Sequence, residues 1–142
     1  MSMQQNSILL PCAAMAAITA AVWTRMYFDR VGELRARRIH PQALATARQA
    51  AETLKNVQAA DNFRNLFEVP VLFYVLCLSL FAAQAVSPPF LAGAWLFVLL
   101  RAAHSWIHCT YNRVMHRFTV YAASSLLLFL MWGAFVVRLL TA

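Results

Sequence analysis

The stretch from Val69 to Leu100 contains no charged side chain, and this feature most limits the folds open to the chain. It is too long for a single helical crossing of a bilayer, which takes about 20 residues. Ser87, Pro88 and Pro89 divide it, because prolines cannot continue a preceding helix and are favoured in the first turn of a new one. The pattern predicts two membrane helices joined by a short turn on the non-cytoplasmic side.

Composition indicates a membrane protein over most of the chain. Of 142 residues, 62% are hydrophobic, 12% are charged and only three are glycine, which is unusual for a soluble domain of this size. The formal net charge of +7 does not indicate nucleic-acid binding, because the basic residues gather where apolar runs end. Cys12, Cys77 and Cys109 lie in apolar runs, so we interpret them as small buried hydrophobic residues rather than a disulfide framework.

We predict one all-α domain over residues 1–142, an integral membrane four-helix bundle. The spans are expected at residues 7–26, 62–85, 89–112 and 118–140, with a cytosolic loop and helix at 27–61. Arginines follow the first apolar run and separate the last two, which marks these segments as cytoplasmic and places both termini on the other side. A signal peptide is the competing interpretation of the first run, but its basic residues follow the apolar core, so we expect the segment to be retained.

Two local features are expected within this plan. From Pro41 to Ala60 the chain is rich in helix formers, and we predict a cytosolic helix that leads without interruption into the second span. Pro70 lacks a backbone donor and clashes with the preceding turn, so a kink is expected beside Glu68. The arginines after the first span are interpreted as an anchor that faces phospholipid head groups.

Polar side chains interrupt the third apolar helix. Arg101, His104, His108 and Asn112 recur at intervals of three, four and four, so on a helix they form one stripe. A charge this deep in hydrocarbon should face protein. With a rise of about 1.5 Å per residue, Arg101 lies about 18 Å from the start of its helix and can meet Glu68, so we predict an ion pair between them. Two interpretations of this pair stay open: it sets the register of the two helices, or it holds a ligand.

The polar residues towards the cytoplasmic side favour a ligand cavity. These residues are Asn65, Arg101, His104, His108, Arg117 and Tyr121. Their hydrogen-bond donors and positive charge in a partly dry site suit a small anionic ligand with carboxylates. Cations beside a thiol also lower the thiol pKa and favour the nucleophilic thiolate, so thiol activation is compatible with these residues, although their spacing does not require it.

Three motifs resemble one known family. They are Asn65, Leu66, Phe67 and Glu68 before Pro70 in the second span, Arg101 with His104 in the third, and Arg117 with Tyr121 at the start of the fourth. They resemble the membrane-associated proteins in eicosanoid and glutathione metabolism (MAPEG), which include microsomal glutathione transferases, leukotriene C4 synthase, prostaglandin E synthase and the non-catalytic five-lipoxygenase-activating protein. The resemblance is to a bacterial-type member, which implies a bacterial inner membrane.

The resemblance implies a homotrimer of four-helix subunits that holds glutathione between neighbouring subunits near the cytosolic face, while a lipophilic electrophile enters from the bilayer. The implied activity is that of a membrane-bound glutathione transferase or peroxidase-like enzyme, with glutathione as co-substrate. Arg117 takes the place of the catalytic arginine that stabilises the glutathione thiolate. The implied glutathione-binding residues are Asn65, Glu68, Arg101, His104, His108 and Tyr121.

Two other functions stay open. A non-catalytic lipid-binding or scaffold protein is favoured by Asp61, which stands where the family often has an arginine, and by His108, which replaces a tyrosine. A metal enzyme would use His104 and His108 with Glu68 or His116, but metal sites usually show a tighter set of ligands, so no metal is predicted. The lipophilic substrate is not indicated, because apolar grooves discriminate weakly between apolar partners.

Overall fold

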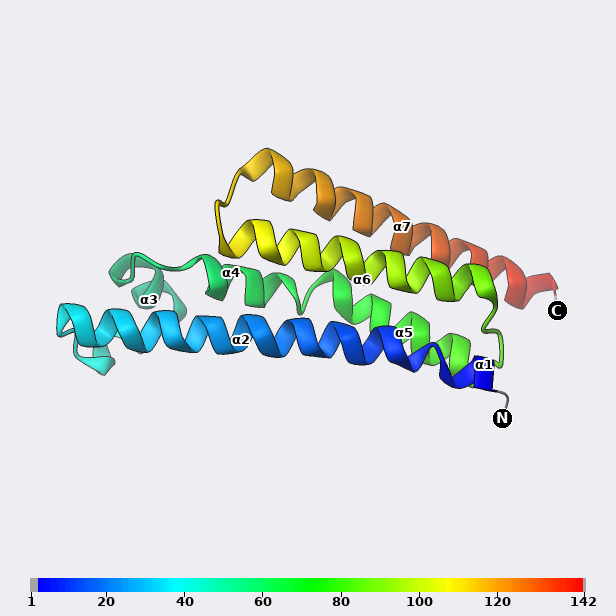
Figure 1. Ribbon diagram of the computed structural model, residues 1–142, viewed down its shortest axis with the longest axis horizontal. Helices are drawn as coiled ribbons and strands as arrows, with labels where there is room; N and C mark the ends of the chain where they lie inside the picture. Colours follow the sequence, from blue (N-terminus) through cyan, green and yellow to red (C-terminus); the bar gives the residue numbers. More distant parts are fainter. Residues whose placement is uncertain (1–2, 142) are drawn as a thin grey trace.

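The computed structural model describes residues 3–141, and within this range every regular element is a helix. The elements are α1 (Met3–Asn6), α2 (Leu9–Arg37), the 3-10 helix η1 (Pro41–Leu44), α3 (Ala47–Thr53), α4 (Gln58–Asn65), α5 (Val69–Ala82), α6 (Pro88–Cys109) and α7 (Val114–Thr141). Four rods, formed by α2, α4 with α5, α6 and α7, run side by side in alternating directions, with α3 at one end and α1 at the other (Figure 1). The predicted all-α four-helix architecture is confirmed.

Four helical stretches are long and apolar enough to cross a membrane. They are Leu9–Arg37, Gln58–Ala82, Pro88–Cys109 and Val114–Thr141. Only 17% to 39% of the most apolar part of each stretch is buried within the chain. Contiguous apolar surface of this extent is unfavourable in water, whereas lipid tails cover it readily. The outward faces of the bundle therefore suit a bilayer.

Three helices are followed by residues in the left-handed region of backbone conformation. Arg38 (φ 52°), Gln84 (φ 51°) and Asn112 (φ 46°) follow α2, α5 and α6. A residue in this conformation ends a helix and turns the next amides back towards its last carbonyls, as when Ala85 N–H donates to the Leu80 carbonyl at 2.9 Å. α6 then begins at a proline, as the sequence at residues 87–89 predicts.

The segment between α2 and α4 differs from the prediction. α2 continues past residue 26 to Arg37, and the predicted uninterrupted helix from residue 41 to the second span is wrong, because η1, α3 and α4 are separate. Thr46 starts α3 with a capping box, in which the side chains of Thr46 and Gln49 each bond the backbone of the other. α3 ends at Thr53, and the next residue, Leu54, has the extended conformation φ −87°, ψ 144°.

Glu33 of α2 explains this break. Its carboxylate accepts hydrogen bonds from the backbone N–H groups of Lys55 (2.8 Å) and Asn56 (3.0 Å) and pairs with Arg37. An amide that bonds to a side chain cannot also extend a helix, so this tertiary contact outweighs local helix propensity. Glu33 lies in the charged extension of α2, beyond its apolar part. The N–H of Lys55 contributes most to holding the pKa of this carboxyl below its ordinary value, against the opposing effect of burial.

The second span is broken beside Glu68, as Pro70 predicts. α4 ends at Asn65 and α5 begins at Val69, while Glu68 between them has the non-helical angles φ −99°, ψ −104°. Among the backbone donors of the described residues, only the Glu68 amide bonds the carbonyl of Asn65, and this bond is long at 3.4 Å. The kink therefore leaves a backbone acceptor available to a donor from another helix.

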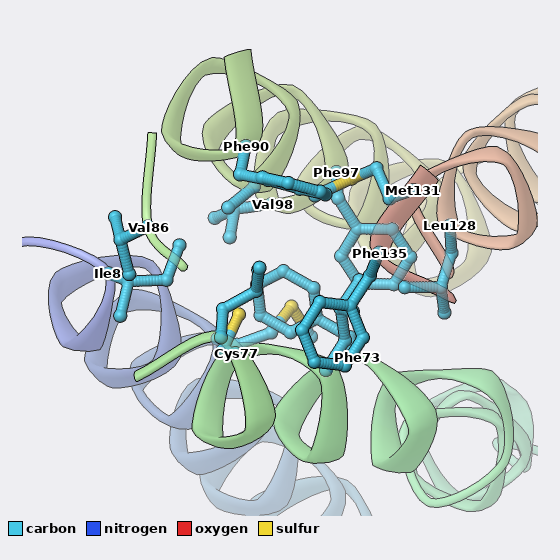
Figure 2. Close-up of a cluster of buried hydrophobic side chains, with 14 of the residues drawn as sticks. Ile8, Phe73, Cys77, Val86, Phe90, Phe97, Val98, Leu128, Met131 and Phe135 are labelled. Atoms are coloured by element: carbon cyan, nitrogen blue, oxygen red, sulfur yellow. The ribbon is translucent and has the colours of Figure 1, made fainter. Parts of the chain in front are cut away.

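The apolar core joins α2, α5, α6 and α7. Figure 2 shows aromatic and aliphatic side chains from these helices meeting, and the rings of Phe73 and Phe97 stack with centroids 4.5 Å apart. A Cβ on Gly93 would come within 2.9 Å of the Met131 sulfur, so α6 and α7 approach closely there. This packing fixes the relative positions of the helices that carry the polar residues.

Candidate functional site: a polar cavity between α4, α6 and α7

A small polar cavity lies where the end of α4 and the beginning of α7 meet α6. Its volume is about 200 Å³, and it is lined by Asn65, His104, Val114, Arg117, Phe118 and Tyr121. Asn65, His104, Arg117 and Tyr121 were predicted as site residues, and the structure brings them together from three helices. Val114 and Phe118 add an apolar wall.

Arg101 is fully buried behind this cavity. Its side chain is 0% exposed, its Nη2 donates to the Asn65 carbonyl oxygen at 3.1 Å, and its Cζ lies 5.4 Å from the centroid of the Tyr121 ring. The latter contact is a cation–π arrangement. Nε and Nη1 have no hydrogen-bond partner within residues 3–141. The prediction that this charge faces protein is confirmed, and the guanidinium contacts two walls of the cavity.

The predicted ion pair between Glu68 and Arg101 is wrong. Glu68 is exposed, takes part in none of the ion pairs among residues 3–141, and does not line the cavity. The prediction placed Glu68 and Arg101 at one depth by a helical rise of about 1.5 Å per residue, which holds only in continuous helices. The break between α4 and α5 removes that relation. Arg101 bonds instead to the backbone acceptor that the break leaves available.

The two buried histidines occupy different places. His104 Nδ1 lies 3.2 Å from the carbonyl oxygen of Arg117. Because a carbonyl only accepts, Nδ1 carries the proton in the neutral ring and Nε2 is an acceptor, which has no partner within the described part of the chain. His108 packs edge-on against His104 with centroids 5.6 Å apart and does not line the cavity. His104 therefore joins α6 to the first turn of α7.

Asn112 orients Arg117. The Arg117 Nη1 donates to the Asn112 side-chain oxygen at 2.8 Å. The prediction that Asn112 continues the helical stripe of Arg101 is wrong, because α6 ends at Cys109 and Asn112 lies in the following turn. Asparagine tolerates the left-handed conformation of this turn better than most residues. The turn thus supplies an anchor for the guanidinium, a role that helical spacing did not indicate.

Asn62 and Ser105 form a second polar contact between α4 and α6 that sequence analysis missed. Asn62 is 0% exposed; its Nδ2 donates to the Cys109 sulfur at 3.5 Å, and its oxygen accepts from the Ser105 hydroxyl at 3.4 Å. Helical spacing could have indicated both residues. Asn62 lies three residues before Asn65, and Ser105 lies four after Arg101, so each shares a helix face with a predicted site residue. These bonds hold α4 against α6 beside the cavity.

The sequence profile of the MAPEG family matches residues 8–137, which include every residue of the cavity. The chain belongs to the MAPEG family. It is therefore a multi-pass membrane protein of a family named for eicosanoid and glutathione metabolism, and its four long apolar helices form a membrane helical bundle. No match was found among curated proteins or among solved structures.

The cavity of this MAPEG protein has a positive electrostatic character. Arg117 lines it and the Arg101 guanidinium lies behind it, whereas the acids of the second span, Asp61 and Glu68, are exposed. Asp61 is 3.8 Å from Arg64, which offsets its charge. Cationic and hydrogen-bonding groups in a partly buried site favour an anionic ligand.

The described part of this MAPEG chain shows no group of side chains that would bind the metal of a metal enzyme. Within residues 3–141 no group of three or more His, Cys, Asp or Glu side chains is placed to hold a metal ion. His104 Nδ1 is hydrogen-bonded to the Arg117 carbonyl, and His116 contacts the Tyr111 hydroxyl at 3.3 Å.

Proposed function

We propose that the protein is a membrane-bound glutathione transferase or peroxidase-like enzyme, which conjugates or reduces lipophilic electrophiles with glutathione. The observation that carries this proposal is the convergence of Arg117, Asn65, His104 and Tyr121 on one cavity in a MAPEG chain. Glutathione presents two carboxylates, an ammonium group and a thiol. Such a ligand needs a cation, amide groups and a partly dry place for its sulfur.

Arg117 is the proposed catalytic residue. Its guanidinium lines the cavity and is held by Asn112, so it can stand beside the glutathione sulfur and stabilise the thiolate. In conjugation, the thiolate forms a C–S bond either by addition to an electron-poor double bond, whose π bond breaks, or by displacement of a leaving group that departs with its bonding pair. The Tyr121 hydroxyl is a second donor in the same cavity. Phe118 and Val114 supply the apolar side from which a lipophilic substrate approaches.

The remaining site residues bind or support glutathione. Asn65 and His104 offer hydrogen bonds to its peptide groups, and exposed Glu68 offers a carboxylate to its ammonium group. Arg101 acts through the two cavity residues that it contacts, Asn65 and Tyr121. His108 supports the ring of His104.

A homotrimer is part of the proposal. The cavity of one chain is about 200 Å³, below the range of about 300 to 1,000 Å³ that ligand sites usually occupy. A neighbouring subunit would complete it, with glutathione held between subunits. Chemical crosslinking in mild detergent should then stop at three chains, and a monomer would contradict this assembly.

The proposed orientation places the cavity towards the cytosol and both termini outside it, in a bacterial inner membrane. The arginines of the α2 extension and of the α6–α7 turn support this orientation. Reporter fusions that are active only outside the cytosol should be active at the C-terminus and inactive when inserted after residue 45.

The decisive experiment is calorimetric titration of glutathione into the detergent-solubilised protein, together with the ultraviolet absorbance of the thiolate. We expect binding with appearance of thiolate, and Arg117→Ala should weaken binding about 10- to 100-fold through loss of a charge-assisted hydrogen bond. Arg113→Ala is the matched control, because Arg113 is exposed one turn earlier and does not line the cavity. Absence of both binding and thiolate in the unmodified protein would overturn the proposal.

A non-catalytic lipid-binding or scaffold protein is the second candidate function. It is favoured by Asp61 and by an apolar groove of about 250 Å³ between α2 and α6, whose lining includes Ile18, Val22 and Trp106. Under this alternative Arg117→Ala leaves cellular function intact, whereas polar substitution of Val22 abolishes it. The calorimetric result with glutathione separates the two candidates.

A further inference from the structure

A second cavity lies at the end of the bundle where α3 lies beside α2 and α4 (Figure 1). Its volume is about 240 Å³, and none of its lining residues belongs to the polar cavity at Arg117. Alanines with short side chains leave this space open on the α3 side; they are Ala45, Ala47, Ala50 and Ala51. Together with the bonds of Glu33, a bond of 2.7 Å from Arg37 Nη1 to the Thr53 carbonyl fixes this wall against α2.

Three ionisable side chains line the second cavity, Arg30 from α2 and Asp61 and Arg64 from α4. Arg30 is half-buried and takes part in none of the ion pairs among residues 3–141. Asp61 and Arg64 are 3.8 Å apart, and both side chains are more than half exposed. A pair this long and this exposed is weak, so both side chains keep hydrogen-bonding atoms for a ligand. The cavity therefore offers two cations and one anion.

The second cavity lies at the level of phospholipid head groups. At about 1.5 Å per residue, Arg30 is about 32 Å along α2 from Leu9, whereas the hydrocarbon core of a bilayer is about 30 Å thick. Trp23 and Tyr27 mark the same boundary, because both rings are exposed and both residue types favour the membrane interface. Met26 lines the cavity one turn nearer the hydrocarbon. A ligand held here can therefore keep its apolar part in the bilayer.

We propose that this cavity binds the head group of a phospholipid that carries ethanolamine. The phosphate is held by the guanidinium groups of Arg30 and Arg64, and the ammonium group donates to the Asp61 carboxylate. The volume is below the range of about 300 to 1,000 Å³ for a whole ligand, which suits a head group whose acyl chains stay outside the cavity.

The three charges distinguish ethanolamine from the other common head groups. A glycerol head group has no cation and would leave Asp61 facing a phosphate, which is unfavourable. A choline head group has a cation without N–H donors, and proteins recognise such cations with aromatic side chains. Among the described residues that line the cavity, none is aromatic. The site is separate from the glutathione cavity, and the inference does not depend on the proposed function.

The test is native mass spectrometry of the full-length protein in detergent, after removal of lipid and addition of phospholipids with identical acyl chains. We expect the ethanolamine lipid to bind at least about tenfold more tightly than the choline and glycerol lipids, since neither of these can donate a hydrogen bond from a cation to Asp61. Arg30→Gln should weaken binding of the ethanolamine lipid about tenfold. Asp61→Asn should remove its advantage over the glycerol lipid.

Arg35→Gln is the matched control. Arg35 belongs to the same helix and carries the same charge, but it is exposed and does not line the cavity, so its loss should leave the affinity unchanged. Equal losses in Arg30→Gln and Arg35→Gln would replace the site by a general attraction to surface arginines.

Three results with the unmodified protein would also overturn the inference. They are equal affinity for the three lipids or a preference for the choline or glycerol lipid, binding of water-soluble phosphoethanolamine as tight as that of the lipid, and displacement of the lipid by glutathione. The last result would assign the cavity to the glutathione site. Failure of glutathione to bind anywhere would overturn the proposed function alone, because the preference for the ethanolamine lipid is measured without glutathione.

Discussion

The Arg101 guanidinium donates a hydrogen bond of 3.1 Å to the backbone carbonyl of Asn65. In a continuous helix the N–H of Val69 would donate to that carbonyl, but the break before α5 prevents this bond. A side chain from the third span thus satisfies an acceptor exposed by the kink in the second. The buried cation satisfies the acceptor that the kink exposes, and it contacts two cavity residues, Asn65 and Tyr121.

Loss of the Arg101 contact should destabilise the protein. Arg101→Met keeps much of the side-chain volume but removes the bond to Asn65, and we expect the free energy of unfolding to fall by about 1–3 kcal/mol. Arg101→Ala also leaves a cavity and should cost about 2–5 kcal/mol. Unfolding by sodium dodecyl sulfate in mixed micelles measures both. Arg113→Ala, at an exposed position, should change the free energy of unfolding by less than about 0.5 kcal/mol. If Arg113→Ala lost as much stability as Arg101→Ala, the stabilising role of the Arg101 contact would be contradicted.

Asn112 should affect ligand binding through Arg117. Asn112→Ala removes the acceptor of the 2.8 Å bond to Arg117, and we expect glutathione affinity to fall roughly 3- to 10-fold. Gln84→Ala is the control, because Gln84 has the same left-handed conformation at another helix end and does not line the cavity. Calorimetry should show weaker binding for Asn112→Ala alone. If both variants lost glutathione affinity to a similar extent, the cause would be backbone strain at the left-handed residue rather than loss of the bond to Arg117.

The two glycines of the last spans should respond differently to a large side chain. Gly93→Leu forces α6 away from Met131 on α7 and should lower the free energy of unfolding by about 1–3 kcal/mol. A Cβ on Gly133 would have no neighbouring atom within 4 Å, so Gly133→Leu should be neutral or stabilising by up to about 1 kcal/mol. The same micelle titration compares the two. A greater loss at Gly133 would contradict the packing of α6 on α7.

Glu33 should hold the segment after α3 against α2 in a pH-dependent way. Because its folded pKa lies below the ordinary carboxyl value, its contribution is present above that value, about 4.3, and is lost as pH falls through the folded pKa. Hydrogen exchange near neutral pH should be about tenfold faster at the Lys55 and Asn56 amides in Glu33→Gln. In stability measurements the difference from the unmodified chain should shrink below about pH 4.

Glu52→Gln is the control for that prediction. Glu52 is exposed and pairs with Arg48 within α3, without contact to the two amides. It should leave their exchange unchanged. Unchanged protection in Glu33→Gln would show that other contacts hold the segment.

Residues whose behaviour follows from local rules were predictable from sequence. The lengths of the uncharged runs set the four helices, Pro70 and Pro88 set a kink and a helix start, and the depth of Arg101 in an apolar helix placed its side chain towards protein. Each of these depends on a few neighbouring residues or on the period of one helix.

Beyond the point where a helix is interrupted, the spacing of residues in the sequence did not predict which side chains share a face. Glu68 lies in the break between α4 and α5, where helical rise no longer places it beside Arg101, and Asn112 lies in the turn after α6, outside the stripe of Arg101. Glu33 bonds amides of a segment with good helix formers and so divides the predicted helix. The sequence by itself determined a MAPEG-type set of membrane helices with a buried cation. Only the tertiary structure decided which polar groups meet, because beyond a helix end the direction of a side chain depends on contacts between distant segments.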